Sequence, residues 1–310
     1  MSFAEKPRIA LVQDSPVFFN AGKTTDKCLE LIGRASSSKP DLIVFPESFI
    51  PGYPRHMIFG SRIGSRSSEG RELWKEYYNN SISVPGPEVK IFEDISKKTG
   101  AYISMGITER DNKSLYCTQL LFSPRNGLIS KHRKIKPTAA ERIVWAEGSG
   151  RDLATQKIAN TIIGTLICWE NYMPLARMSM YLKGVNLYLA PTADYRESWQ
   201  TSLRHIALEG RCFVIGVNQY TGIDEYPGHI TESCGLSKKD LGGSRGGSCI
   251  ISPMGEYIAG PLWDEPGIIC AELDLGMVTG ASLDFDAAGH YNRPDIFDIK
   301  INDQPETLVD

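Results

Sequence analysis

Short, nearly continuous apolar segments alternate along this chain with longer segments of helical periodicity. The apolar segments have the length of strands, and apolar residues at consecutive positions are typical of strands buried on both faces. They comprise residues 8–13, 41–47, 101–109, 115–123, 161–168, 186–193, 213–220, 248–253 and 268–275. Because predicted strands and helices alternate from one end to the other, the pattern predicts an α/β fold.

Four segments predict helices, and the clearest is residues 87–100. There Val89, Phe92 and Ile95 recur at helical spacing, and Gly100 follows as a C-cap. The other three are residues 24–36, 173–184 and 199–212. No low-complexity linker divides the chain, so we expect one domain over residues 1–300 and a loose polar tail at 301–310.

Composition narrows the classes of function. Hydrophobic residues make up 41% and charged residues 23%, which is typical of a globular protein. The formal net charge of -3 gives no reason to expect nucleic acid or an anionic membrane as a partner. No run approaches the ~18 apolar residues of a membrane-spanning helix, and the first apolar run is too short for a signal peptide.

The number and spacing of cysteines and histidines indicate the redox compartment of the protein and whether it has a metal site. The seven cysteines form no CxxC pair, which favours free thiols in a reducing cytoplasm over a disulfide framework. The five histidines are scattered, and none has the short spacing to another histidine or cysteine that zinc sites show. We therefore expect neither a metal nor another cofactor.

Two conspicuous motifs have ordinary interpretations. The segment GGSRG, residues 242–246, matches a nucleophile elbow, but no strand precedes it and no helix follows, so a flexible loop is the better interpretation. The segment KHRKIK, residues 131–136, is either a basic patch, a solvated face, or a place where one lysine points inward as a catalytic cation.

Cys168 stands where an apolar run meets the polar turn CWENY. As a nucleophile it needs an activator, because a free thiol has a pKa of about 8.5. A downstream histidine could serve, and so could a lysine–glutamate pair. Glu47 ends the run DLIVFPE much as Cys168 ends its own, and ligands gather at the carboxyl ends of strands. A buried structural thiol is the alternative.

Three segments taken together resemble the nitrilase branch of the carbon–nitrogen hydrolase superfamily. They are VFPESFIPGYP (44–54), KHRKIKPTAAERIVWAEGSG (131–150) and GTLICWENYMPLAR (164–177). The resemblance continues through APTAD (190–194) and DFDAAGHYNRPDIF (284–297), and it is strongest to plant and fungal-type nitrilases. It implies a four-layer αββα sandwich and hydrolysis of a nitrile to a carboxylic acid and ammonia without a cofactor.

The resemblance also implies the site residues. Cys168 would be the nucleophile, Glu47 the general base, Lys134 the cation that stabilises developing charge, and Glu141 a second glutamate that orients the site. The implied substrate-binding residues are Tyr53, Thr138, Trp145 and Trp169.

One loop departs from the pattern of the family. Residues 146–150 read AEGSG where G-x-G-D-G is common, and this affects the loop rather than the catalytic positions. The alternatives are an amidase of the same superfamily, a non-catalytic interaction protein and, more remotely, a Cys-His protease. The resemblance further implies homo-oligomers, with contacts through residues 173–184 and 199–211. There Met173, Met178, Met180 and Tyr181 look exposed, and the alternative is that they simply pack on the sheet.

Overall fold

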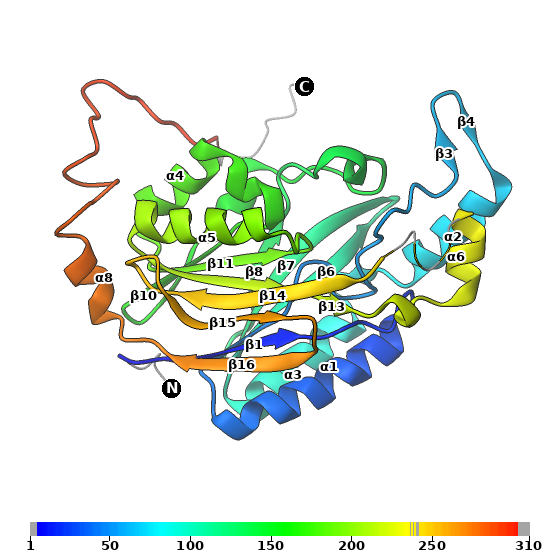
Figure 1. The fold of residues 1–310 in the computed structure, drawn as a ribbon, viewed down its shortest axis with the longest axis horizontal. Coiled ribbons are helices and arrows are strands. Elements are labelled where there is room, and N and C mark those ends of the chain that lie inside the picture. Colours follow the sequence, from blue (N-terminus) through cyan, green and yellow to red (C-terminus); the bar gives the residue numbers. More distant parts are fainter. Residues whose placement is uncertain (1–4, 236, 238, 240–241, 303–310) are drawn as a thin grey trace.

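Two β-sheets stacked face to face between layers of helices form the body of the computed structural model (Figure 1). The described residues are 5–235, 237, 239 and 242–302, so most of the predicted tail lies outside them. The arrangement confirms the predicted four-layer α/β sandwich. Helices α1 and α3 lie below the first sheet, and α4 and α5 lie above the second.

The first sheet has the strand order β16-β1-β2-β6-β7-β8, with β5 paired to β6. Its strands are β1 (Arg8–Gln13), β2 (Leu42–Val44), β5 (Ile82–Ser83), β6 (Tyr102–Asp111), β7 (Ser114–Ser123), β8 (Gly127–Arg133) and β16 (Gly267–Glu272). Strands β1, β2 and β6 run parallel, and β7, β8 and β16 pair antiparallel with their neighbours.

The second sheet has the order β13-β14-β12-β11-β10-β9, with β15 paired to β14. Its strands are β9 (Gln156–Ile158), β10 (Thr161–Thr165), β11 (Leu187–Thr192), β12 (Phe213–Asn218), β13 (Tyr220–Thr221), β14 (Ser244–Ile251) and β15 (Tyr257–Trp263). Here β10, β11 and β12 form the parallel group. Each sheet thus contains three adjacent parallel strands.

The helices comprise two layers and a peripheral group. They are α1 (Ala21–Ala35), α2 (Ser68–Asn79), α3 (Pro87–Thr99), α4 (Pro174–Leu182), α5 (Glu197–Gly210), α6 (Gly228–Cys234) and α8 (Gly276–Ala281). Helices α2 and α6 lie together at one end, beside the small hairpin of β3 (Ser61–Arg62) and β4 (Ser65–Arg66). Among the described residues, none of the helices is long and apolar enough to cross a membrane.

Burial on both faces explains why the strands are continuously apolar. In β1, Ala10 and Val12 pack with the buried face of α1, whereas Ile9 and Leu11 pack between the two sheets. A third apolar cluster lies between the second sheet and helices α4 and α5. Since successive side chains of a strand point to opposite faces, a strand in the middle of four layers needs apolar residues at every position.

The helix ends follow local chemistry. Helix α3 stops at Gly100, whose φ of 77° lies in the left-handed region, as the sequence predicts. In α4, however, Met180 and Tyr181 are buried against the sheet, so the expectation that they are exposed is wrong. Met180 lies about one turn after Ala176 and so shares its inner face, and Met173 is exposed at the start of the helix.

Candidate active site

Three polar side chains meet at one end of the sandwich because each follows the end of a strand. Glu47 comes just after β2, Lys134 directly follows β8, and Cys168 begins a 3₁₀ turn (Cys168–Tyr172) just after β10. All three are buried. The sequence predicted convergence of Glu47 and Cys168 at strand ends, and the structure brings both to the surroundings of Lys134.

Lys134 is the centre of this cluster. Its Nζ lies 2.7 Å from Glu47 Oε1 and 2.7 Å from Glu141 Oε2. Burial alone would lower the pKa of Lys134, but the two carboxylates outweigh it and hold that pKa well above its ordinary value. The ammonium therefore stays charged, as a group that stabilises negative charge must.

Glu141 is held by three donors on two sides. Its Oε2 accepts from Lys134 and from the backbone N–H of Thr138 at 2.6 Å, and its Oε1 accepts from the Tyr53 hydroxyl at 2.7 Å. The contact with Thr138 fixes the start of the 3₁₀ turn Ala139–Ile143. Glu141 therefore couples the position of Lys134 to that of Tyr53.

Cys168 lies on a sharp turn. Its φ of 51° is in the left-handed region, which costs a non-glycine residue about 1–3 kcal/mol and is common at functional sites. The Thr192 hydroxyl, at the end of β11, donates to the Cys168 Sγ at 3.1 Å. A nucleophile elbow needs a strand that leads into a sharp turn, and Cys168 has this geometry whereas GGSRG does not. Ser244 instead lies in β14 and donates to the Gln219 carbonyl.

Glu47 and Cys168 both have raised pKa values, chiefly because burial disfavours their charged forms. For Glu47 the Lys134 ammonium and the Cys117 thiol, 3.4 Å from Oε1, oppose that rise. For Cys168 the negative Glu47 adds to it. Cys168 is therefore a thiol at rest, and it would need a neighbouring base to remove its proton before it could act as a nucleophile. Glu47 Oε2 has no hydrogen-bond partner among the described residues.

A buried imidazole–carboxylate pair links the lysine and cysteine segments. Glu170 Oε1 accepts from the N–H of Ile135, directly after Lys134, and its Oε2 accepts from the N–H of Ile167, directly before Cys168. The same Oε2 lies 2.8 Å from His132 Nε2. One carboxylate thus holds together the two backbone segments that present the lysine and the cysteine.

His132 is protonated in this arrangement. Its Nδ1 lies 2.5 Å from the Asp152 carbonyl oxygen and its Nε2 faces Glu170, so both ring nitrogens face acceptors and both must donate. Burial opposes this state, but Glu170 outweighs it and the pKa of His132 is raised.

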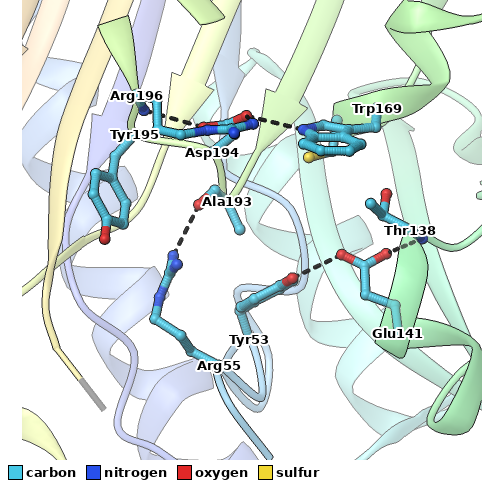
Figure 2. Close-up of a pocket in the computed structure, with 10 residues that line it drawn as sticks. Tyr53, Arg55, Thr138, Glu141, Trp169, Ala193, Asp194, Tyr195 and Arg196 are labelled. Atoms are coloured by element: carbon cyan, nitrogen blue, oxygen red, sulfur yellow. Dashed lines mark hydrogen bonds and ion pairs between the residues drawn. The ribbon is translucent and has the colours of Figure 1, made fainter. Parts of the chain in front are cut away.

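A cavity of about 220 Å³ opens over Cys168. The residues that line it are Tyr53, Arg55, Thr138, Glu141, Cys168, Trp169, Ala193, Asp194, Tyr195 and Arg196. Figure 2 shows Tyr53 and Glu141 pointing toward each other on one side, and Arg55 reaching the Ala193 carbonyl from another. Hydrogen bonds from Arg196 and Trp169 outweigh the effect of burial and lower the pKa of Asp194.

Three of the four predicted substrate-binding residues line this cavity, namely Tyr53, Thr138 and Trp169. The fourth, Trp145, is buried and does not line it. Its ring packs edge-on against Tyr53, and Lys134 Nζ lies 5.9 Å from its centroid. Trp145 therefore packs against Tyr53 on the side of Tyr53 that faces away from the cavity.

The basic segment 131–136 covers the end of β8, and its basic side chains form ion pairs with carboxylates. Lys131 and Arg133 bind Glu109, and Lys136 binds Glu147 at the surface. Lys134 points inward, as the third of the three interpretations had it. The interpretation as a basic binding patch loses its support, because these charges have carboxylate partners.

Histidine and metal chemistry find no support at this site. No histidine is among the described residues that line the cavity, which removes the basis for a Cys-His protease. Within the described ranges, no group of three or more histidine, cysteine or acidic residues is placed to hold a metal ion. The six cysteines with described side chains are all free thiols.

Sequence reasoning missed several polar groups around the cavity. Arg55 directly follows the segment VFPESFIPGYP and Thr192 lies inside APTAD, but the spacing of neither residue reveals where its side chain points. Glu170 follows Cys168 within the same motif. Their partners lie far away in the sequence, so no local pattern could have identified them.

Comparison with known proteins identifies the family. The sequence model of the carbon–nitrogen hydrolase family matches residues 8–282. The chain belongs to the carbon–nitrogen hydrolase family. Nitrilase 3 of Arabidopsis thaliana is 42% identical over 97% of this chain and 88% of its own length, and an aliphatic nitrilase of Sinorhizobium fredii is 43% identical over 98% of both. A bifunctional nitrilase/nitrile hydratase of Lupinus angustifolius is 44% identical over 97% of this chain and 88% of its own.

Solved structures of this family have the same fold. A carbon–nitrogen hydrolase of Helicobacter pylori superposes with a TM-score of 0.72 at 18% identity, covering 94% of this chain and 97% of that one. An amidase of Nesterenkonia superposes with a TM-score of 0.68 at 17% identity, covering 92% and 97%. At such identities the comparison establishes the four-layer fold of this carbon–nitrogen hydrolase and nothing finer.

Proposed function

We propose that this carbon–nitrogen hydrolase converts an organic nitrile and two waters into a carboxylic acid and ammonia, using Cys168, Glu47, Lys134 and Glu141. Nitrilase relatives at 41–44% identity over nearly the whole chain support the nitrilase activity. The observation that carries the residue roles is the buried Lys134 ammonium, 2.7 Å from each of two carboxylates, in electrostatic reach of the Cys168 thiol.

The first step is addition of sulfur to the nitrile carbon. Glu47 removes the thiol proton as Cys168 Sγ bonds to that carbon, because the raised pKa values of both groups keep the resting nucleophile protonated. Negative charge develops on the nitrile nitrogen, where the Lys134 ammonium stabilises it and Glu47 delivers the proton that it took from the thiol. A preorganised donor of this kind contributes roughly 3–4 kcal/mol. The product of this step is a thioimidate.

Two waters complete the reaction. Glu47 takes a proton from the first water as it adds to the thioimidate carbon, and the tetrahedral intermediate expels ammonia and leaves a thioester. The second water hydrolyses the thioester to the carboxylic acid and restores the thiol. If the intermediate expels the Cys168 sulfur instead of ammonia, the product is an amide. Relatives named bifunctional nitrilase/nitrile hydratase support including this outcome in the assay.

Tyr53, Thr138 and Trp169 are proposed to contact the substrate. Thr138 lines the cavity, and its buried Oγ1 has no hydrogen-bond partner among the described residues. The exposed edge of Trp169 forms part of the wall beside Cys168. Trp145 is proposed to support Tyr53 rather than to contact the substrate directly.

The assembly of copies is also a proposal. Helices α4 and α5 form one outer layer, and Leu175, Leu182 and Leu208 are exposed on them. Exposed apolar side chains gathered on one face are typical of contact surfaces. We therefore propose that this layer joins two copies of the chain. The free thiols are consistent with a reducing, cytoplasmic setting.

The test is release of ammonia, acid and amide from matched panels of nitriles and amides. We expect wild-type protein to release acid and ammonia from nitriles, and Cys168→Ala to lose at least roughly a thousandfold in rate. Cys249→Ala, another buried thiol in β14, is the matched control. Ammonia release from amides alone would assign the chain to the amidases. No ammonia release from folded protein with any nitrile or amide would leave a non-catalytic interaction protein as the alternative.

A further inference from the structure

The cavity over Cys168 is small and its wall is rich in charge. Its volume of about 220 Å³ is below the roughly 300–1,000 Å³ of sites for drug-sized ligands. A short nitrile therefore fits in the same cavity as Cys168 and the charged groups of the wall.

Most of the charges in or beside this wall are already paired. Lys134 has Glu47 and Glu141 as partners. Arg196 binds Asp194 through two nitrogens. The charged groups that remain must then be sought among the other lining residues.

Arg55 is the exception. No ion pair joins it to a carboxylate among the described residues. Its Nη2 donates to the Ala193 carbonyl at 2.8 Å, and the guanidinium also hydrogen-bonds the Tyr226 side chain. The guanidinium lies between two aromatic rings, 5.4 Å from the centroid of Tyr53 and 5.0 Å from that of Tyr195. This cation is thus held at a fixed place in the cavity, with donors to spare.

The anchor of Arg55 relates it to the nucleophile. Ala193 directly follows Thr192, whose hydroxyl donates to the Cys168 Sγ. Figure 2 shows the Arg55 side chain beginning beside Tyr53 and reaching the Ala193 carbonyl, with Glu141 on the far side of Tyr53. A substrate whose nitrile carbon sits at Cys168 can therefore extend its other end toward the guanidinium.

We infer that Arg55 forms an anion subsite, and that the preferred substrates of this chain are short nitriles carrying a carboxylate. The inference rests on the proposed nitrilase function and specifies its substrate class. A guanidinium presents five N–H donors in a planar fork that matches a carboxylate, and Ala193 and Tyr226 use only part of this set. The neutral alternative, an apolar tail, would leave the Arg55 charge without a partner in a cavity closed by substrate.

The test compares two nitriles of equal size, 3-cyanopropanoate and 4-oxopentanenitrile, in which a methyl group replaces one carboxylate oxygen. Ammonia release gives kcat/KM for each. We expect wild-type protein to prefer the carboxylate by roughly 10- to 100-fold, mainly through KM, because hydrogen bonds to charged groups are among the stronger ones. High salt should reduce the preference.

Variants of Arg55 test whether this residue carries the preference. Arg55→Gln keeps a donor for the Ala193 carbonyl and removes the charge, so the ratio of the two kcat/KM values should fall toward one. Arg55→Lys should retain part of the ratio. Arg62→Gln, in the exposed hairpin strand β3, changes net charge equally and should keep the wild-type ratio.

The outcomes separate the inference from the proposed function. Hydrolysis of neutral nitriles without any preference for the carboxylate, or equal losses for both substrates in Arg55→Gln, overturns the anion subsite and leaves the nitrilase function standing. Silence toward every nitrile from folded wild-type protein overturns both. If Arg55→Gln does not fold, the wild-type ratio and its salt dependence still decide.

Discussion

At the scale of single residues, the site depends on the placement of charge in a dry environment. Lys134 is fully buried, and its charge is tolerated only because Glu47 and Glu141 both contact its Nζ. Removing one partner of a buried pair typically costs about 3–5 kcal/mol, since the other charge is then left uncompensated. The same burial keeps Cys168 a thiol at rest, whereas the charge on Lys134 persists against burial because of the two carboxylates.

The acid limb of the pH–rate profile should report the Glu47 cluster. The raised pKa means that the base form is lost, as pH falls, at a higher pH than for an ordinary glutamate of about 4.3. Cys117 donates to Glu47 and lowers that pKa, so Cys117→Ala should move the acid limb of kcat/KM further upward. Cys249→Ala should leave the limb in place. A downward shift in Cys117→Ala would contradict the role of Glu47 as the base.

Thr192 should make the Cys168 thiol easier to ionise. Its hydroxyl donates to Sγ, and this bond lowers the pKa of Cys168 against the larger effect of burial. We expect Thr192→Val to slow alkylation of Cys168 by iodoacetamide about three- to tenfold at fixed pH, the value of one ordinary hydrogen bond. Thr192→Ser should react at nearly the wild-type rate. Equal slowing in both variants would point to packing instead.

At the scale of elements, the site is assembled from loops at strand ends that one buried pair holds together. Glu170 receives the N–H groups of Ile135 and Ile167, and His132 fixes the orientation of that carboxylate. The 3₁₀ turn of Cys168 and the end of β8 are therefore positioned relative to each other by side-chain bonds, because no strand pairing joins them.

The His132–Glu170 pair should make stability depend on pH. The folded pKa of His132 is raised, so its contribution is fully present below the unfolded value of about 6.5 and is lost as pH rises through the folded pKa. The unfolding free energy of His132→Gln should thus fall furthest below wild type near pH 6, with the gap narrowing in alkaline solution. Urea unfolding across pH measures this.

The control for that measurement is His205→Gln, in which an exposed histidine of α5 is replaced. We expect its unfolding free energy to follow wild type at every pH. A gap in His132→Gln that widens as pH rises would contradict the protonated state of His132. Asp152, whose carbonyl receives Nδ1, stays in place in both variants.

At the scale of the whole molecule, the two sheets bury their inner faces against each other and their outer faces under helices. The layer of α4 and α5 nevertheless exposes Leu175, Leu182 and Leu208. Leu175 is 68% exposed, so an aspartate there should cost the isolated chain little stability.

If the α4–α5 layer joins copies of the chain, Leu175→Asp should lower the assembly mass measured by light scattering. Burying an uncompensated carboxylate in an apolar contact is costly, and a single substitution suffices to shift such an equilibrium. Ile91→Asp, on α3 in the opposite outer layer, is the matched control and should keep the wild-type mass. A mass unchanged in both would remove this layer as the contact surface.

The sequence by itself determined the class of the fold and most of its strands, and it pointed to the residues proposed as the nucleophile and its partners. Continuous apolar runs predicted strands buried on both faces, and Gly100 predicted the end of α3. Both features depend on nearby residues alone, so the sequence was enough to find them. Strand β8 was missed, since its polar residues look like a surface patch until their partners are known. The family motifs located Glu47, Lys134, Glu141 and Cys168.

Only the tertiary structure decided what those residues touch. Arg55 is 138 residues from its Ala193 partner, and Glu170 is 38 residues from His132. It also decided that Trp145 supports the wall from behind and that Met180 faces the sheet. Charge pairing and burial are properties of distance in space, and residues far apart in the chain come together only when the strands that carry them are packed side by side.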